Sequence, residues 1–191
     1  DVYAFVKNNG GKVAVYKENL YKPMPGYRFI ASNTDRSRYY VGELNGRSSK
    51  QAYMDALHIS ESNIINQTFH NPLGKMNGQD ICIISLKEVS GNGLCCYRQV
   101  NDSDVLVLLE EQDYNEILDE TLQRIRRDFN HISGVFSINC VFRYLLFSQE
   151  HHMEDYLKTM STLGDHAGLI GFGEHYNQQF VNQTMTCVVF E

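Results

Sequence analysis

Residues 134–143 read Gly-Val-Phe-Ser-Ile-Asn-Cys-Val-Phe-Arg, residues 168–175 read Gly-Leu-Ile-Gly-Phe-Gly-Glu-His, and residues 182–190 read Asn-Gln-Thr-Met-Thr-Cys-Val-Val-Phe. The first run predicts a buried strand over 134–140, which passes into a helical pattern over about 144–163. The other two runs predict strands around 168–173 and 184–190. Polar and charged side chains stand at the edges of these apolar elements, so this final third is the best candidate for a functional site.

The preceding residues predict hairpins and short helices. Strands over 2–6 and 13–16 are expected to pair across residues 8–11, and strands over 27–31 and 39–44 across residues 33–37. Helices are expected after Ser48, over 60–69 and after Asp113, where acids come early and arginines late. Strands over 80–86, 94–98 and 105–109 are spaced for a meander. The fold class predicted is α+β, mainly antiparallel sheet built from hairpins, with about four helices packed on it.

Composition narrows the class of protein. The chain has 191 residues, 42% of them hydrophobic, which is enough for one sizeable domain or two small ones. A net charge of −6 argues against nucleic acid as a partner. Five cysteines without C-x-x-C or zinc-type spacing indicate a reducing compartment, hence the cytoplasm. No run approaches the ~18–20 apolar residues of a membrane helix, so no direct membrane contact is expected.

The chain opens at Asp1, without Met and within an apolar alternation. We therefore expect it to be a piece of a longer protein.

Arg143 and Cys140 are the first candidate site residues, because they stand with Asn139 where a buried strand becomes a helix. Arg143 has the donor geometry for a carboxylate or another anion, and the alternative is an internal salt bridge with Glu174. Cys140 would need a base and a lowered pKa to act as a nucleophile, and a buried structural cysteine is favoured. His175 follows Glu174 directly after a glycine-rich turn, which suggests a ligand-facing position.

Two further patterns are rejected. The glycines at 168, 171 and 173 lack the G-x-G-x-x-G spacing, and a strand follows them instead of a helix, so a dinucleotide loop is not expected. His151 and His152 are adjacent on a predicted helix and point roughly 100° apart, so they and His166 are interpreted as surface residues. No metal and no cofactor is predicted.

Several short motifs occur in a recognisable order. They are Glu43-Leu-Asn-Gly-Arg-Ser-Ser49 with Ala52 and Tyr53, Asn71-Pro-Leu-Gly74, Cys140-Val-Phe-Arg143, Leu169-Ile-Gly-Phe-Gly-Glu-His175 and Asn182-Gln-Thr184. On these residues the chain, from about Gly26 to its end, resembles the C-terminal domain of the FIST family. It departs from the family pattern where Ile170 and Phe172 replace an aromatic pair and His175 replaces an aliphatic residue.

The resemblance implies a cytoplasmic input domain that senses small ligands such as amino acids. It implies attachment, in the same or a partner chain, to an output module such as a chemotaxis receptor, a diguanylate cyclase, a kinase or an F-box protein. Residues 26–191 would be the FIST C-like domain, and residues 1–25 the tail of a preceding FIST N-terminal domain. A dimer stays open.

The ligand-binding residues predicted are Asn139, Arg143, Glu174 and His175, with Asn182 nearby. Arg143 would bind a ligand carboxylate and Glu174 an ammonium group. No catalytic residue is predicted. Two alternatives remain: a Cys140-dependent hydrolase or transferase, with His175 as a candidate base, and a structural protein-interaction module in which Arg143 and Glu174 only pair with each other.

Overall fold

The computed structural model describes residues 5–78 and 80–191. Their contacts divide the chain into two compact units. Unit 1 comprises the described residues up to Asn19 together with Asp113–Phe180 and Thr184–Glu191, and unit 2 comprises Leu20–Gln112 together with Val181–Gln183. Neither unit is therefore a single continuous segment of chain.

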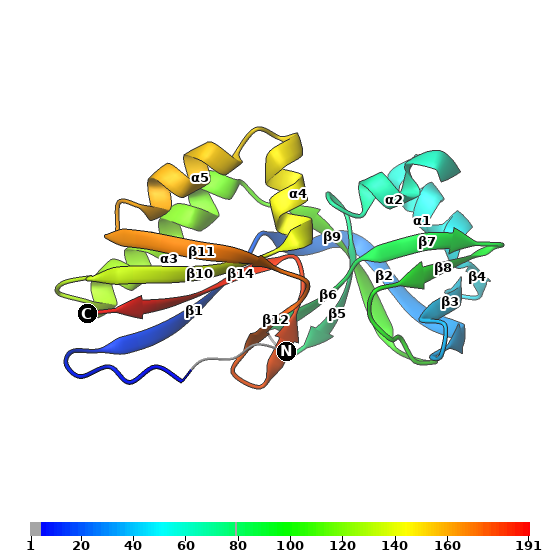
Figure 1. Cartoon of the computed structure of the whole chain (residues 1–191). Coiled ribbons are helices and arrows are strands. Elements are labelled where there is room, and N and C mark those ends of the chain that lie inside the picture. The colour runs from blue at the N-terminus through cyan, green and yellow to red at the C-terminus, as the bar shows by residue number, and fades with distance from the viewer. Residues whose placement is uncertain (1–4, 79) are drawn as a thin grey trace. The chain divides into compact units, whose positions relative to one another are not determined.

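Unit 1 is built on a four-stranded sheet with the order β1-β14-β10-β11 (Figure 1). The strands are β1 (Val13–Asn19), β10 (Gly134–Cys140), β11 (Asp165–Gly171) and β14 (Thr184–Phe190). β14 is antiparallel to both β1 and β10, whereas β10 and β11 are parallel. The predicted strands over 134–140 and 184–190 are confirmed. The parallel pair needs a crossover connection, which helices provide.

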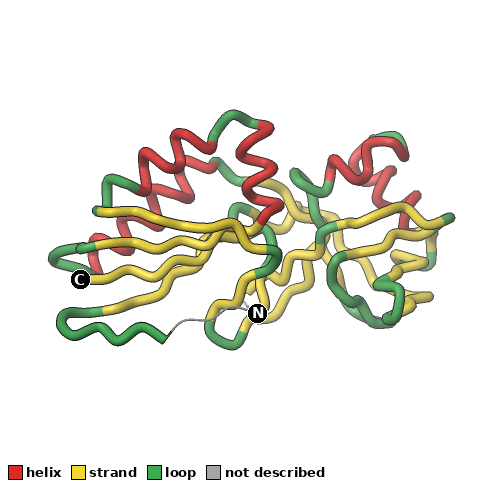
Figure 2. The backbone as a smooth tube through the Cα atoms, viewed as in Figure 1, coloured by secondary structure: helices red, strands yellow, loops and turns green. Residues whose placement is uncertain are grey.

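Three helices, α3 (Tyr114–Asp128), α4 (Val141–Gln149) and α5 (Met153–Met160), cover one face of this sheet (Figures 1 and 2). The helix predicted after Asp113 is confirmed as α3. The Asp113 side chain caps it by accepting hydrogen bonds from the backbone N–H groups of Asn115 and Glu116. Its buried stripe turns toward the sheet and consists of Leu118, Thr121, Leu122 and Ile125.

The single helix predicted over 144–163 is wrong, because the structure has two helices there. The helical conformation is interrupted at His151, which has a left-handed backbone conformation with φ 55°. The backbone N–H of His152 then bonds to the carbonyl of Phe147, and α5 begins one residue later. The apolar spacing continues through the break, so periodicity alone does not reveal it.

The hairpin predicted between 2–6 and 13–16 is not confirmed. Residues 2–4 lie outside the described part of the chain, and Phe5 and Val6 are exposed and not in a strand. The second half, β1, pairs instead with β14 at the other end of the chain, with Val15 opposite Val188. The assignment of residues 1–25 to a preceding domain stays a prediction.

A short hairpin that the sequence did not predict follows β11. Its strands are β12 (Glu174–Tyr176) and β13 (Gln179–Val181), and β12 packs against β1, β10 and β14. It lies on the side of the sheet away from the helices (Figure 1). The predicted strand around 168–173 therefore ends early, at Gly171, and Glu174 opens a new element.

Unit 2 contains an eight-stranded sheet organised around one long strand, β2 (Tyr21–Asp35). A register shift between Pro23 and Arg28 divides this strand's pairing with β9. The strand order is β6-β5-β9-β2-β3-β8-β7, with β4 paired to β3. The remaining strands are β3 (Tyr40–Leu44), β4 (Arg47–Ser48), β5 (Leu73–Asn77), β6 (Asp80–Ile84), β7 (Leu86–Ser90), β8 (Gly93–Cys96) and β9 (Val105–Glu111).

The predictions for unit 2 are confirmed in part. β2 pairs with β3 as expected, and Ser48 caps α1 (Ser49–Leu57). The predicted 60–69 helix is shorter, a 3-10 turn (Glu61–Asn63) followed by α2 (Ile64–Gln67). The meander is wrong, because β6, β8 and β9 are not neighbours in the sheet. With helices packed on largely antiparallel sheets, the predicted α+β class is confirmed.

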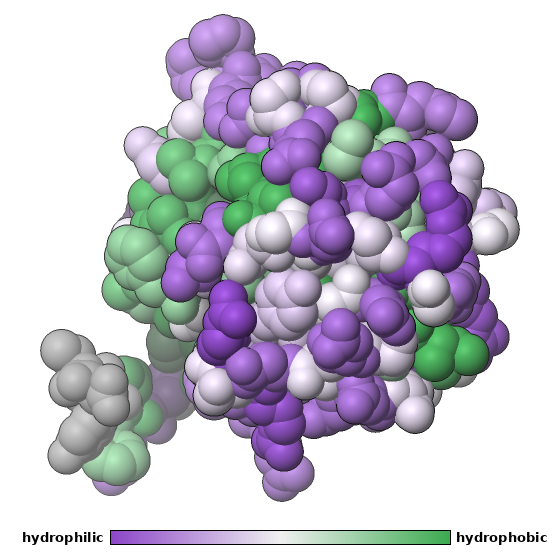
Figure 3. All heavy atoms as spheres, turned by 90° about the vertical axis from the view of Figure 1, so that its right-hand side faces the viewer, coloured by the Kyte–Doolittle hydropathy of each residue, from purple (hydrophilic) through white to green (hydrophobic). Residues whose placement is uncertain are grey.

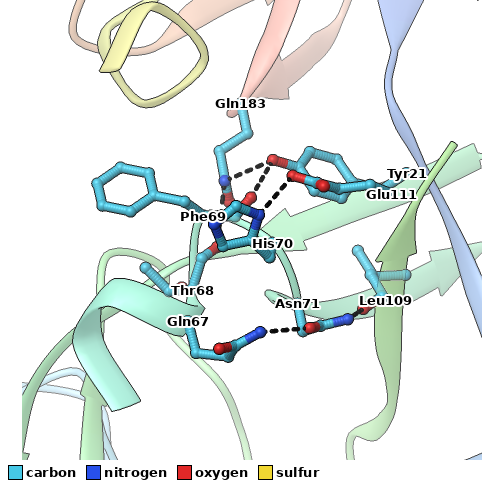
Figure 4. A network of polar contacts seen from close by, with 9 residues as sticks. All are labelled: Tyr21, Gln67, Thr68, Phe69, His70, Asn71, Leu109, Glu111 and Gln183. Carbon is cyan, nitrogen blue, oxygen red and sulfur yellow. Dashed lines mark hydrogen bonds and ion pairs between the residues drawn. The ribbon is translucent and has the colours of Figure 1, made fainter. Parts of the chain in front are cut away.

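A buried polar network closes the core of unit 2 (Figure 4). Gln183 lies at its centre: its Nε2 donates to the Tyr21 hydroxyl at 3.0 Å and to the Thr68 carbonyl at 3.2 Å, and its Oε1 accepts from Ser85 at 2.7 Å. The Tyr21 hydroxyl donates in turn to the Phe69 carbonyl at 2.6 Å. These polar groups are satisfied by each other. The face of unit 2 seen in Figure 3 is mostly hydrophilic, with scattered apolar side chains.

Candidate functional site

Buried polar atoms without a hydrogen-bond partner gather in unit 1. Among the described residues, they belong to Glu18, Asn139, Arg143, His152, Glu174 and Thr184. We call these six residues the polar cluster. A buried polar group without a partner costs free energy, and most native groups avoid this state. Because these residues all belong to unit 1, this unit contains buried polar atoms to which the described residues offer no hydrogen bond.

The register of the sheet places most of the polar cluster at one end. Asn139 lies opposite Met185 of β14, which lies opposite Glu18 of β1, and Thr184 is the residue of β14 before Met185. Cys140 ends β10, and α4 begins directly after it. This is the carboxyl end of the parallel pair β10–β11, where a crossover helix starts. In sheets with parallel strands, ligands bind preferentially at this end.

Arg143 is 1% exposed and forms an ion pair with Glu18 of β1. Its Nη2 donates to Glu18 Oε1, while Arg143 Nε and Nη1 and Glu18 Oε2 remain without partners. The guanidinium lies over the rings of Phe147 at 4.6 Å and Tyr156 at 5.4 Å from their centroids. The alternative in which Arg143 pairs with Glu174 is wrong. Its partner is a carboxylate 125 residues away in sequence.

Asn139 belongs to a buried hydrogen-bond chain on the helix side of the sheet. Its Nδ2 donates to the Tyr156 hydroxyl at 3.0 Å, which donates to Ser137 Oγ at 3.4 Å. Ser137 Oγ lies 2.9 Å from Nε2 of His166. Burial raises the pKa of Tyr156 and lowers the pKa of His166, so both are neutral near pH 7. The carbonyl oxygen of Asn139 is left without a partner.

His152 lies beside this chain and against aromatic rings. Its ring centroid is 4.8 Å from that of Phe147 and 5.3 Å from that of Tyr114. Burial lowers its pKa, and the charge of Arg143 contributes in the same direction. The expectation that His152 is a surface residue is therefore wrong, and His166 is half-buried as well. Among the described residues, no three His, Cys, Asp or Glu side chains converge as a metal site.

Glu174 is 2% exposed, and within the described structure neither of its carboxylate oxygens accepts a hydrogen bond of ordinary geometry. Burial raises its pKa to about 7, although the nearby Gly173 N–H and Cys140 thiol act in the opposite direction. A Cβ added to Gly171 would lie 3.1 Å from Glu174 Oε1 and 3.2 Å from Ile138 Cγ2, so glycine makes room for the carboxyl. Glu174 is the most isolated charged group of the polar cluster.

Glu174 and Arg143 share one end of β10 but lie on different sides of it. Successive side chains of a strand point to opposite faces. Asn139 faces the helices and Tyr156, so Ile138 and Cys140 face the other side, where Glu174 lies. The two predicted charge partners therefore do not touch. A ligand that reached both would have to bind across the end of the strand.

The other predicted site residues lie elsewhere. His175 is exposed and stacks edge-on against Phe180 at 5.3 Å, and it lines a groove of about 140 Å³ with Ile138 and Tyr176. Asn182 belongs to unit 2. Cys140 is buried beside Glu174.

Three members of the polar cluster, Glu18, Thr184 and His152, were not among the predicted site residues. Glu18 could have been suspected from the sequence, because it alternates with the strand residue Tyr16 and so shares its buried face. Thr184 and His152 carry no comparable signal.

Comparisons with known proteins identify the family. A model of the FIST C domain matches residues 50–177, which is more than half of the chain. Searches of curated proteins and of solved structures give no significant match. None of the helices in the described residues is long and apolar enough to span a bilayer. The chain belongs to the FIST C domain family, whose members are sensory domains of signal-transduction proteins.

Proposed function

We propose that this chain is a cytoplasmic, non-enzymatic input domain that binds a small ligand, with amino acids as the ligand class. The site is the carboxyl end of β10, and its residues are Asn139, Arg143 and Glu174, with His175 at the adjoining groove. The observation that carries the proposal is the burial of Glu174 with both carboxylate oxygens unpartnered among the described residues. An ammonium group would supply the missing donors.

The polar cluster supports a ligand with both kinds of charge. Arg143 keeps two donor atoms, Nε and Nη1, that Glu18 does not use, and either can donate a charge-assisted hydrogen bond to a ligand carboxylate. Asn139 Oδ1 offers a further acceptor. An amino acid carries an ammonium and a carboxylate, which matches these atoms in kind. Five free cysteines agree with a reducing compartment.

Signal transmission requires that the ligand bind one conformation better than another. We propose that an output domain, in the same or a partner chain, reads this difference. The hairpin β12–β13 carries Glu174 at its first residue and leads through Val181–Gln183 into β14. A ligand held by Glu174 would therefore act on a segment that unit 2 anchors through Gln183.

Isothermal titration calorimetry against a panel of the common amino acids tests the proposal. The informative variants are Glu174→Gln, which removes the charge, and Arg143→Lys, which keeps the charge but removes the fork. Glu154→Gln and Arg127→Lys on exposed helix faces are matched controls. We expect at least one ligand to bind the wild type and both controls, and to bind each site variant at least tenfold more weakly. Equal binding by the Glu174→Gln protein would place the site elsewhere.

A further inference from the structure

The surroundings of Glu174 contain no charge that would compensate its carboxylate, as far as the described residues go. β12 packs against β1, β10 and β14, and pairs with β13. The titratable side chains on these elements are few. Lys17 of β1 bonds to Gln179 and lies over Tyr176, Glu18 pairs with Arg143, and Tyr16 bonds to Asp128. The others are the thiols of Cys140 and Cys187, the exposed ring of His175 and the hydroxyl of Tyr176, which donates to the Val15 carbonyl.

None of these described groups forms an ion pair with Glu174, and no charged neighbour contributes to its pKa, which burial raises to about 7. A carboxyl group buried without an opposite charge is favoured in its neutral form. A cationic group placed against it reverses that preference, because the ion pair needs the carboxylate. The Glu174 carboxyl is therefore favoured in its protonated form without a cation and in its ionised form with one.

We propose that a cationic ligand group displaces the proton of Glu174, so that ligand binding and proton release at this carboxyl are one coupled event. The inference rests on the proposed function, since it concerns the same site. It adds a regulatory property: the sensor responds to ligand and to pH through one side chain. Below neutral pH the ligand competes with the proton, and its apparent affinity falls about tenfold for each pH unit. Well above neutral pH this dependence disappears.

A small groove adjoins the buried carboxyl of Glu174. The Glu174 carboxyl approaches Gly171 so closely that a Cβ there would lie 3.1 Å from Oε1, and Gly173 has φ 124°, which a residue with a side chain rarely adopts. Ile138 and His175, which adjoin Glu174 in space and in sequence, line the groove of about 140 Å³. Glu174 is not one of the lining residues, so the groove adjoins the carboxyl without containing it.

The test follows the titration of the Glu174 carboxyl carbon by NMR on the full chain, assigned by its loss in Glu174→Gln. Methylammonium is the cationic probe, glycine the zwitterionic probe and acetate the anionic control. We expect a midpoint near neutral pH in the free protein and a downward shift of at least about one pH unit with saturating methylammonium or glycine. Acetate should leave the titration midpoint of Glu174 unchanged. Calorimetry of glycine at pH 6 in phosphate and in MES, two buffers that differ in ionisation heat, should report release of about one proton.

A midpoint near that of an ordinary glutamate in the free protein overturns the inference. So does binding of glycine or another amino acid without a shift of the Glu174 midpoint, although the proposed sensory function then survives. If methylammonium shifts the midpoint and no amino acid binds, the proton coupling stands and the proposed ligand class falls. If neither methylammonium nor any amino acid of the panel shifts the midpoint, the coupling is refuted.

Discussion

Replacing Glu174 with Gln should stabilise unit 1 at high pH and not at low pH. A glutamate carboxyl exposed to water, as in the unfolded chain, has a pKa of 4.5, whereas the pKa of Glu174 in the folded protein is about 7. Because the folded state holds the proton more tightly, the stability contribution is fully present below pH 4.5 and is lost as pH rises to about 7. A shift of this size corresponds to at most about 3 kcal/mol. Glutamine keeps the shape and cannot ionise, so its pH dependence should be flatter by that amount.

The assay is amide hydrogen exchange in β10 and β14, measured between pH 5 and pH 8 and corrected for the intrinsic exchange rate. Exchange in these strands reports on unit 1, whereas a single melting curve would mix two units. Glu154→Gln, on the exposed face of α5, is the control and should track the wild type. Parallel profiles for wild type and Glu174→Gln would refute the reasoning, because they would mean that the Glu174 carboxylate is compensated in the folded state.

Three further substitutions test other contacts of the two units. Arg143→Ala leaves Glu18 buried without its counter-charge and should destabilise unit 1 by about 3–5 kcal/mol, whereas Arg143→Lys should cost less. Gln183→Ala removes the hydrogen bonds to Tyr21 and Thr68, which Figure 4 draws, and the bond from Ser85, and it should destabilise unit 2 by about 3 kcal/mol. Gly168→Ala would place a Cβ 2.6 Å from the Ser137 carbonyl oxygen and should cost about 1–3 kcal/mol. Hydrogen exchange in the affected unit measures each loss.

Matched controls separate these effects from general damage. Arg127→Ala and Gln99→Ala change exposed side chains of the same kinds and should leave exchange nearly unchanged. Gly134→Ala, on the strand next to Gly168, places its Cβ 3.4 Å from the Asp165 carbonyl oxygen, an ordinary contact, and should be tolerated. Equal losses for Gly168→Ala and Gly134→Ala would contradict the close-approach argument. An Arg143→Ala protein as stable as wild type would mean that the ion pair with Glu18 contributes nothing.

Local features of the fold could be predicted from the sequence because their causes are local. The cap at Asp113, the cap at Ser48 and the hairpin turn after β2 each depend on residues within one turn of chain. Pairing between distant strands depends on which edges meet, and nothing in an apolar run encodes that. The pairing of β1 with β14, at the other end of the chain, was therefore not predicted.

The candidate site was predicted in part for the same reason. Asn139, Arg143 and Glu174 could be singled out as polar residues at the ends of apolar elements, and all three are buried. The partner of Arg143 could not be predicted, because Glu18 comes near Arg143 only when β1, β14 and β10 are placed side by side in the sheet. The sequence also could not show that Glu174 and Arg143 lie on different sides of β10. Glu174 opens β12, and β12 was not predicted.

The central claim is that the isolated carboxyl of Glu174 binds the cationic group of a small ligand. Calorimetric titration of glycine at pH 8, where Glu174 is ionised, into the wild type, Glu174→Gln and Glu154→Gln tests it most directly. We expect binding to the wild type and to the Glu154→Gln control, and an affinity at least tenfold weaker for Glu174→Gln. Equal binding to all three proteins, or binding to none of them, would contradict it.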